Sequence, residues 1–138
     1  MIYQETITII TPGRGTTDIT PLLSRQLKQS GITTGICNIF IQHTSASLIL
    51  CENADPAVRV DLETFMSNLV KDGDPAFRHD TEGADDMSAH IRSILTDISL
   101  TVPVSNGRFM LGTWQGIYLY EHRYSGFNRR VLITLYGE

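Results

Sequence analysis

Two histidines and four carboxylates lie within the thirteen residues HDTEGADDMSAHI, residues 79–91. Only 19% of the chain is charged, so titratable groups are concentrated in this segment. Asp86 and His90 are four residues apart, a spacing that places both side chains on one edge of a helix. Such a carboxylate can orient an imidazole as a metal ligand or as a general base. Alternatively, Asp86 only complements the helix dipole and His90 is a hydrogen-bonded histidine at the core boundary.

Two further polar segments follow predicted strands. Strand alternation directs His43 toward the core side, at the strand end, where a histidine can line a pocket. The hydroxyls after it, including Ser45, could bind a phosphate or carboxylate together with turn amides, or could only stabilise the turn. No G-x-S-x-G motif surrounds these serines, which argues against a serine hydrolase. Glu52 and Asn53 end the next strand, and Glu52 has no simple structural role there.

A fourth polar segment is GTWQGIYLYEHR, residues 112–123. Gln115 and Glu121 share one face of the predicted strand, and His122 lies on the face that carries the aromatic residues. Such an aromatic face is typical of packing. Because Glu121 and His122 point in opposite directions, they cannot both reach one atom unless a bulge intervenes.

All four histidines of the chain therefore lie in polar segments. No pair has the spacing of a zinc finger or of the H-E-x-x-H motif. Scattered histidines can still bind a divalent metal, zinc or magnesium, with one coordination position open. The candidate metal ligands are His79, His90 and His122.

The elements that must position these side chains are strands and three helices. Strands are predicted at 2–10, 35–43, 47–53, 99–104, 107–112, 113–122 and 129–136. Helices are predicted at 20–31, after Asp55-Pro56, and at about 85–97. Helical spacing predicts that the second helix buries Val58, Leu62, Phe65, Met66 and Leu69. It predicts a buried stripe of Met87, Ile91, Ile94, Leu95 and Ile98 on the third helix. The order of elements favours an α+β fold, mainly an antiparallel, jelly-roll-like β-sandwich, over βαβ winding.

Composition narrows the possible partners. The chain has 138 residues, 41% of them hydrophobic, which suits one domain spanning residues 1–138. Its net charge is −4 and its longest basic run is the pair Arg129-Arg130, which argues against nucleic-acid binding. No signal peptide or membrane-spanning run is visible, so we expect a cytoplasmic protein that does not bind membranes. Cys37 and Cys51 are expected to be reduced.

The sequence resembles the YjbQ-like family, often labelled secondary thiamine-phosphate synthase enzymes. The resemblance rests on HTSASL (43–48), ENADP (52–56) with VDLE (60–63), HDTEGADDMSAHI, and GRFMLGTWQGIYLYEHR (107–123). It implies a homotrimer of α+β subunits with polar clefts near the subunit contacts. The residues assigned to catalysis are His43, Glu52, Asp86, His90 and Glu121. The residues assigned to substrate binding are Ser45, Asn53, Asp61, Asp80, Gln115 and Arg123.

Three functions compete at this point. The family label implies a weak activity that joins a pyrimidine methyl diphosphate to a thiazole phosphate and expels diphosphate. That reaction needs cations around the diphosphate, and the chain has only eleven basic residues without a cluster. The second possibility is a metal-dependent hydrolase or lyase of a small anionic metabolite, with Glu121 or Asp86 as base. The third is a trimeric metabolite-binding protein without catalysis.

Overall fold

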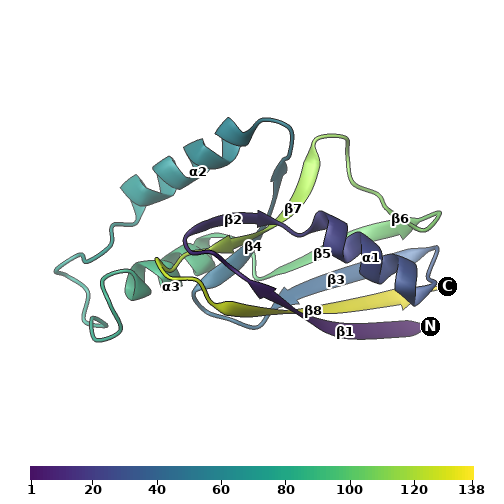
Figure 1. Ribbon diagram of the computed structural model, residues 1–138, viewed down its shortest axis with the longest axis horizontal. Helices are drawn as coiled ribbons and strands as arrows, with labels where there is room; N and C mark the ends of the chain where they lie inside the picture. Colours follow the sequence, from purple (N-terminus) through teal and green to yellow (C-terminus); the bar gives the residue numbers. More distant parts are fainter.

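The computed structural model describes residues 1–138, whose eight strands form two antiparallel sheets (Figure 1). The larger sheet has the order β1 (Ile2–Ile10), β8 (Asn128–Gly137), β3 (Gly35–Ile41), β5 (Ser99–Ser105) and β6 (Arg108–Phe109). The smaller sheet has the order β2 (Gly15–Asp18), β7 (Gln115–Glu121) and β4 (Ala46–Glu52). The predicted α+β class, with antiparallel strands and three helices, is confirmed.

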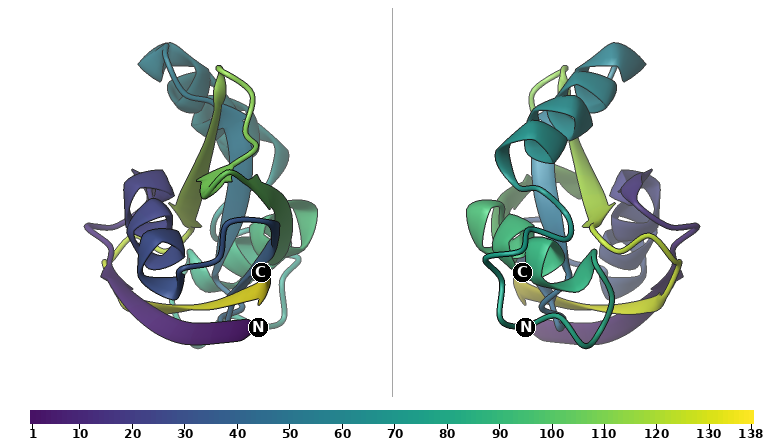
Figure 2. Two further views of the ribbon diagram at one scale, coloured as in Figure 1. Left: turned by 90° about the vertical axis from the view of Figure 1, so that its right-hand side faces the viewer. Right: turned by 90° about the vertical axis from the view of Figure 1, so that its left-hand side faces the viewer.

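The hydrophobic core lies between the two sheets and α1 (Thr20–Ser30). Alternate residues of the larger sheet point into it, as Ile39 and Ile133 do from directly paired positions of β3 and β8. The smaller sheet contributes Leu48 and Leu119, which are likewise paired and fully buried. The larger sheet curves around α1, and the smaller sheet stands above it (Figure 2). Burial alternates along β3 and β8 as a period-two pattern predicts, whereas β7 is buried on both faces.

Helix α1 follows its sequence signals. Pro21 lies in its first turn, where a proline needs no hydrogen-bond donor, and Gly31 ends it in the left-handed conformation with a φ of 72°. Leu23 and Leu27 are the buried apolar residues of the helix. This helix covers the core, and Thr20 in its first turn accepts a hydrogen bond from the Ile117 amide of β7.

Helix α2 (Pro56–Leu69) is less buried than its sequence predicts. It begins at the predicted place, where the Asp55 side chain accepts a hydrogen bond from the Ala57 amide. Of the five residues expected to form its buried stripe, only Met66 is buried, and Phe65 is 63% exposed. The helix projects from the body of the molecule (Figures 1 and 2), which leaves Val60, Phe65 and Leu69 exposed.

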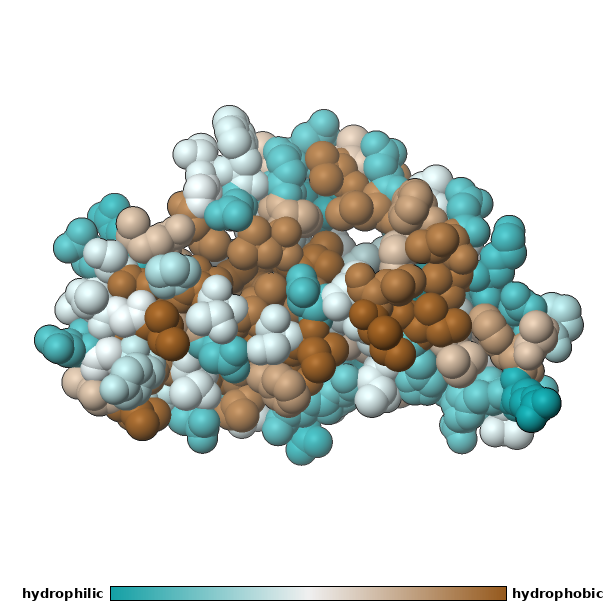
Figure 3. Space-filling view, turned by 180° about the vertical axis from the view of Figure 1, so that it is seen from behind, coloured by the Kyte–Doolittle hydropathy of each residue, from teal (hydrophilic) through white to brown (hydrophobic).

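Helix α3 (Asp86–Leu95) buries a different side from the one that its sequence predicts. The expected stripe was wrong: Ile94 is 80% exposed, and Leu95 and Ile98 are also exposed. The buried side is polar or small and consists of Asp86, Ser88, Ala89, Arg92 and Ser93. The contacts of Asp86 with Arg123 and of Arg92 with Glu63 hold the polar side inward. Figure 3 shows hydrophobic residues gathered on the back of the molecule, including the end where α3 lies.

The sequence predicts no membrane-spanning helix and two reduced cysteines. None of the three helices combines the length and apolarity needed to cross a membrane. Cys37 is buried in β3 and Cys51 lies in β4, and both are free thiols.

Candidate functional site

His79, Asp86 and His90 converge at the start of α3. His79 lies in the segment between α2 and α3, and Asp86 and His90 lie one turn apart on α3. One carboxylate oxygen, Asp86 Oδ2, is 2.7 Å from His79 Nε2 and 3.1 Å from His90 Nε2. The ligand atoms of the three residues all lie within 4.8 Å of one another, close enough for a single cation to reach them. The predicted pair of Asp86 and His90 therefore lies close together on α3, and His79 joins it from the preceding loop.

Arg123 holds the carboxylates of this cluster. Its Nη1 donates to Asp86 Oδ1 at 2.9 Å, its Nε donates to Asp85 Oδ2 at 2.9 Å, and its Nη2 donates to the Glu82 carbonyl at 2.8 Å. Asp85 makes no side-chain capping bond at the helix end and instead accepts from Arg123 and the Tyr124 amide. Arg123, expected to bind substrate, thus has all three nitrogens engaged within the protein.

The position of His90 is fixed by the backbone of the segment after β3. His90 Nδ1 is 2.9 Å from the Thr44 carbonyl oxygen. Because a carbonyl can only accept, Nδ1 carries a proton and Nε2 is the nitrogen that faces Asp86. A bare Nε2 beside a carboxylate oxygen would be repulsive, so a proton or a metal cation has to lie between these two atoms. Such a hydrogen bond on the far nitrogen is also how metal-binding histidines are oriented.

Electrostatics keeps Asp86 ionised. Burial raises the pKa of Asp86, but the hydrogen bond with His79 and the contacts with His90 and Arg123 outweigh it and leave the pKa below its usual range. Burial likewise raises the pKa of Asp85, and the contacts with Arg123 and the Tyr124 amide more than offset it. Both carboxylates are therefore negative at neutral pH, as ligands of a cation must be.

The segment that carries His79 is fixed by a residue that the sequence patterns did not single out. Asp72 accepts from Arg14 at 2.6 and 3.0 Å and from the Tyr124 hydroxyl at 2.6 Å, and it also hydrogen-bonds with Ser88 of α3. Burial raises the pKa of Asp72, but these contacts outweigh it and hold the pKa far below its usual range. Asp72 sits in a polar loop without a recognisable spacing, and Arg14 is remote in sequence, so no local pattern revealed their contact.

A hollow of about 450 Å³ adjoins the cluster, lined by His43, Thr44, His90, Ser93, Ile94 and Ile98. His43 Nε2 accepts a hydrogen bond from the Arg130 amide at 2.8 Å, so its exchangeable proton is on Nδ1. Burial lowers the pKa of His43, and the charges of Arg129 and Arg130 lower it further. His43 is thus a neutral hydrogen-bond donor at the edge of the hollow.

Glu121 is engaged in a buried network of its own. Its Oε1 accepts from the Thr11 hydroxyl and from Arg129 Nε, each at 2.7 Å. Its Oε2 accepts from the amides of His122 and Arg123 and from Arg129 Nη2. With both oxygens saturated and the side chain buried, this arrangement favours a structural role over that of a general base.

His122 lies outside the metal-type cluster. It is fully buried, its Nε2 is 2.8 Å from Ser47 Oγ, and its ring contacts Tyr120 with a centroid separation of 4.3 Å. Ser45 is also buried, and its hydroxyl accepts from Arg129 Nη2. The structure therefore brings together two of the three predicted metal histidines, with Asp86 as the third group.

The remaining candidates lie elsewhere. Glu52 accepts from the amides of Ala54 and Asp55, and thereby shapes the turn before α2. Asn53 donates to the carbonyls of Thr113 and Gln115, and the Gln115 side chain accepts from the Gly112 amide. Asp61 is exposed on α2. Asp80 is exposed beside His79, where both line a smaller hollow of about 130 Å³.

The comparisons with known proteins cover the whole chain. The profile of a family described as "UPF0047 protein YjbQ-like" matches residues 5–138. The chain is 48% identical over 141 residues to the YjbQ protein of Salmonella typhimurium, with both chains covered completely. It is 46% identical over 136 residues to a UPF0047 protein of Synechocystis, covering 99% of this chain and 92% of the relative. The resemblance noted from the four motifs is confirmed.

The fold is also similar to solved structures. A YbjQ-like protein of unknown function from Sulfolobus solfataricus superposes with a TM-score of 0.90 at 25% identity, covering 100% of this chain and 99% of the other. An uncharacterized conserved protein of the YjbQ/UPF0047 family from Clostridium acetobutylicum gives a TM-score of 0.88 at 30% identity, covering 96% and 99%. These likenesses support the architecture, and their descriptions assign no activity.

His122 should make the protein sensitive to mild acid. Burial, together with the charges of Arg92, Arg14 and Arg129, lowers the pKa of His122 from 6.5 to about 3. Between these values the unfolded chain binds a proton that the folded chain does not, so the free energy of unfolding falls as the pH is lowered. The slope contributed by His122 approaches about 1.4 kcal/mol per pH unit. Urea unfolding at pH 7.0, 6.0 and 5.0 measures it.

The matched variants for this experiment are His122→Gln, which keeps a polar group near Ser47, and His43→Gln at a half-buried position. We expect a clearly shallower pH dependence for His122→Gln, and a smaller effect in the same direction for His43→Gln, because the pKa of His43 is also lowered but its side chain is less buried. An unchanged slope in a folded His122→Gln protein would contradict the neutral state of His122.

Proposed function

The chain belongs to the YjbQ-like UPF0047 family, and from this premise we propose that it is a metal-dependent hydrolase or lyase of a small anionic metabolite. The observation that carries the proposal is the convergence of His79, Asp86 and His90 on one point within 4.8 Å. Two imidazoles and one carboxylate are the ligand types that zinc and other divalent transition metals prefer. Three protein ligands leave coordination positions for water and substrate.

The surroundings of the cluster support a metal centre. Arg123 and the Thr44 carbonyl orient Asp86 and His90 from outside, which is the support that catalytic metal ligands commonly have. The His79 and His90 side chains remain 47% and 28% exposed, so a small substrate can approach them from solvent. A divalent cation at this point would polarise a substrate oxygen or a water molecule.

The hollow beside His90 is the proposed substrate site. A cation held by the cluster would attract an anionic group, and Ile94 and Ile98 offer an apolar wall for the rest of the substrate. His43, neutral and protonated on Nδ1, is suited to donate a hydrogen bond to a substrate oxygen at the edge of this hollow. Its Nε2 is occupied by the Arg130 amide, which argues against His43 as a general base.

Thiamine-phosphate synthesis is the alternative that the family label suggests. Expulsion of diphosphate needs cationic side chains free to bind it. Arg123 is the arginine that contacts the cluster, and its nitrogens are already bound by Asp85, Asp86 and the Glu82 carbonyl. The geometry therefore favours the metal-dependent hydrolase or lyase, and we expect any synthase activity to be weak.

Metal content tests the proposed centre directly. Protein purified without chelators or affinity-tag metals should contain about one equivalent of zinc or another transition metal per chain by elemental analysis. His79→Ala and His90→Ala should lose the metal while keeping a native circular-dichroism spectrum. His43→Ala, a neighbouring histidine outside the cluster, should keep it. Absence of metal from the wild type, with no thermal shift on adding divalent ions, would remove the basis of the proposal.

Activity separates the competing functions. We expect metal-dependent turnover of small phosphate or carboxylate esters, reduced at least 100-fold in His90→Ala and retained in a surface control such as Arg25→Gln. In the same preparations, formation of thiamine phosphate from its two precursors should be slow. Efficient synthesis that survives His90→Ala would instead favour a synthase that does not use this cluster. Ligand-induced stabilisation without turnover of any substrate would favour a binding protein.

We also propose that the protein is a cytoplasmic homotrimer. Both cysteines are free thiols, which suits a reducing compartment. Large apolar side chains are exposed on α2 and at the end of α3, and surfaces of this kind commonly bind another protein chain. These exposed residues are Val60, Phe65, Leu69, Ile94, Leu95 and Ile98. Because Ile94 and Ile98 also line the hollow beside His90, assembly would cover part of the proposed substrate site.

Light scattering tests the assembly. Wild-type protein should show three times the mass of one chain, and Ile94→Asp should shift the population toward smaller species because it places a charge on the exposed stripe. Ile10→Asp, an exposed isoleucine of β1, provides the control and should leave the mass unchanged. A monomeric wild type would contradict the proposal.

A further inference from the structure

Four buried polar atoms beneath α2 have no hydrogen-bond partner in the protein. They are Arg92 Nε, Arg92 Nη2, Tyr120 Oη and His122 Nδ1. Arg92 is 0% and Tyr120 is 2% exposed. Arg92 Nη1 is satisfied by both carboxylate oxygens of Glu63, at 2.9 and 3.0 Å, but the remaining N–H groups of its guanidinium are not. A buried donor without an acceptor destabilises the fold, and a charged one does so more strongly.

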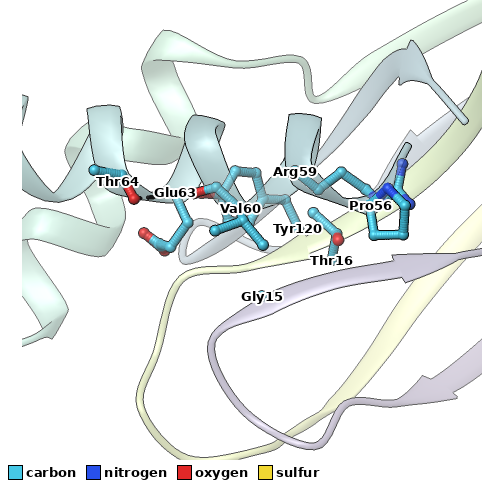
Figure 4. A pocket seen from close by; sticks show the side chains of 8 residues that line it. All are labelled: Gly15, Thr16, Pro56, Arg59, Val60, Glu63, Thr64 and Tyr120. Carbon is cyan, nitrogen blue, oxygen red and sulfur yellow. Dashed lines mark hydrogen bonds between the residues drawn. The ribbon is translucent and has the colours of Figure 1, made fainter. Parts of the chain in front are cut away.

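A hollow of about 390 Å³ opens beside these atoms: Tyr120 lines it, and so does Glu63, the partner of Arg92. Figure 4 shows it between one side of α2 and strand β2, with the Tyr120 side chain from β7 among the lining residues. Arg59, Val60, Glu63 and Thr64 contribute from α2, and Thr16 contributes from β2. Because Glu63 both lines the hollow and binds Arg92, the Arg92 guanidinium lies directly behind this wall.

The charges of the lining favour an anion. Its two charged residues are Arg59 and Glu63, and Glu63 is already neutralised by Arg92. Arg59 stacks on the Tyr118 ring and donates to the Glu52 carbonyl through Nη1, which leaves Nε and Nη2 for a ligand. Burial and the negative charge of Glu63 raise the pKa of Tyr120, so its hydroxyl remains a donor at neutral pH.

We propose that this hollow is a second ligand site, which binds a small metabolite through a carboxylate or phosphate group that accepts hydrogen bonds from Tyr120 and Arg59, with the positive charge of Arg92 behind Glu63. An oxyanion offers several acceptor lone pairs at once, and a guanidinium with a free N–H pair binds such a group in a bidentate manner. The volume suits a metabolite of the size of a sugar phosphate or an amino acid. The surrounding hydroxyls of Thr16 and Thr64 can bind the rest of such a molecule.

This site is separate from the histidine–aspartate cluster. Arg92 follows His90 by two residues on α3, which places their side chains about 200° apart around the helix axis. Asp86 and His90 therefore face the loop that carries His79, whereas Arg92 faces α2 and Glu63. The ligand site accordingly does not depend on the proposed metal.

Inorganic phosphate and acetate are the two probes that test the site, because they represent its two possible anionic groups. Titration into ¹⁵N-arginine and ¹³C-tyrosine labelled His90→Ala protein, which cannot bind phosphate through the cluster, should shift the Arg92 Nε–H and Tyr120 signals in a saturable way. The probe that binds with the lower dissociation constant shows whether the site prefers a phosphate or a carboxylate group. Tyr120→Phe and Arg59→Gln should each weaken binding about tenfold, since each removes one charge-assisted or buried hydrogen bond.

Matched controls are Tyr136→Phe and Arg25→Gln, which make the same chemical changes at exposed positions away from the hollow. Both should bind as the parent protein does. Failure of phosphate and acetate alike to shift the Arg92 and Tyr120 signals would overturn the proposal and leave water as the partner of the unpaired atoms. Equal binding by a folded Tyr120→Phe protein and its parent would overturn it as well.

Discussion

The contact of Arg123 with Asp85 and Asp86 determines how the rest of this end of the molecule is arranged. Both carboxylates are buried, and two adjacent buried negative charges would repel each other strongly without a cation beside them. One guanidinium donates to both and links the end of β7 to the start of α3. Removing one partner of such a buried pair typically costs about 3–5 kcal/mol, because the other charge remains desolvated.

Because Arg123 fixes the first turn of α3, it also fixes the rotation of the whole helix. With Asp86 turned inward, His90 must lie above it one turn later, and Arg92 must point to the other side. Ser88 then faces Asp72, and Ser93 faces β4, where its hydroxyl donates to the Ala46 carbonyl. The apolar residues Ile94 and Leu95 are left facing outward. A polar constraint at one end of the helix has thus overridden the hydrophobic periodicity of its sequence.

The sequence predicted the three helices and seven of the eight strands, because strand alternation, prolines at helix starts and a glycine at a helix end are local signals. It missed β2, a strand of four residues that pairs with β7. It also predicted the Asp86–His90 edge, which depends only on helical spacing. It could not predict which side of α2 or α3 is covered, because an apolar stripe does not reveal whether the covering surface belongs to the same chain. The sequence also could not predict that His79 contacts Asp86, because the path of the loop that carries His79 brings the two side chains together. His122 was predicted to bind a metal, but it is buried and contacts Ser47 instead.

The outward apolar stripe and the inward charged residues of α3 both need partners that the helix itself does not supply. An outward apolar stripe exposes surface that water disfavours, and inward charged groups require fixed partners. Glu63 meets one such need, since it reaches from α2 to Arg92 and is among the few contacts that hold this projecting helix against the body. Together with the hydrogen bond from Arg59 to the Glu52 carbonyl, this ion pair ties α2 to the body and leaves Val60 and Phe65 on its exposed side.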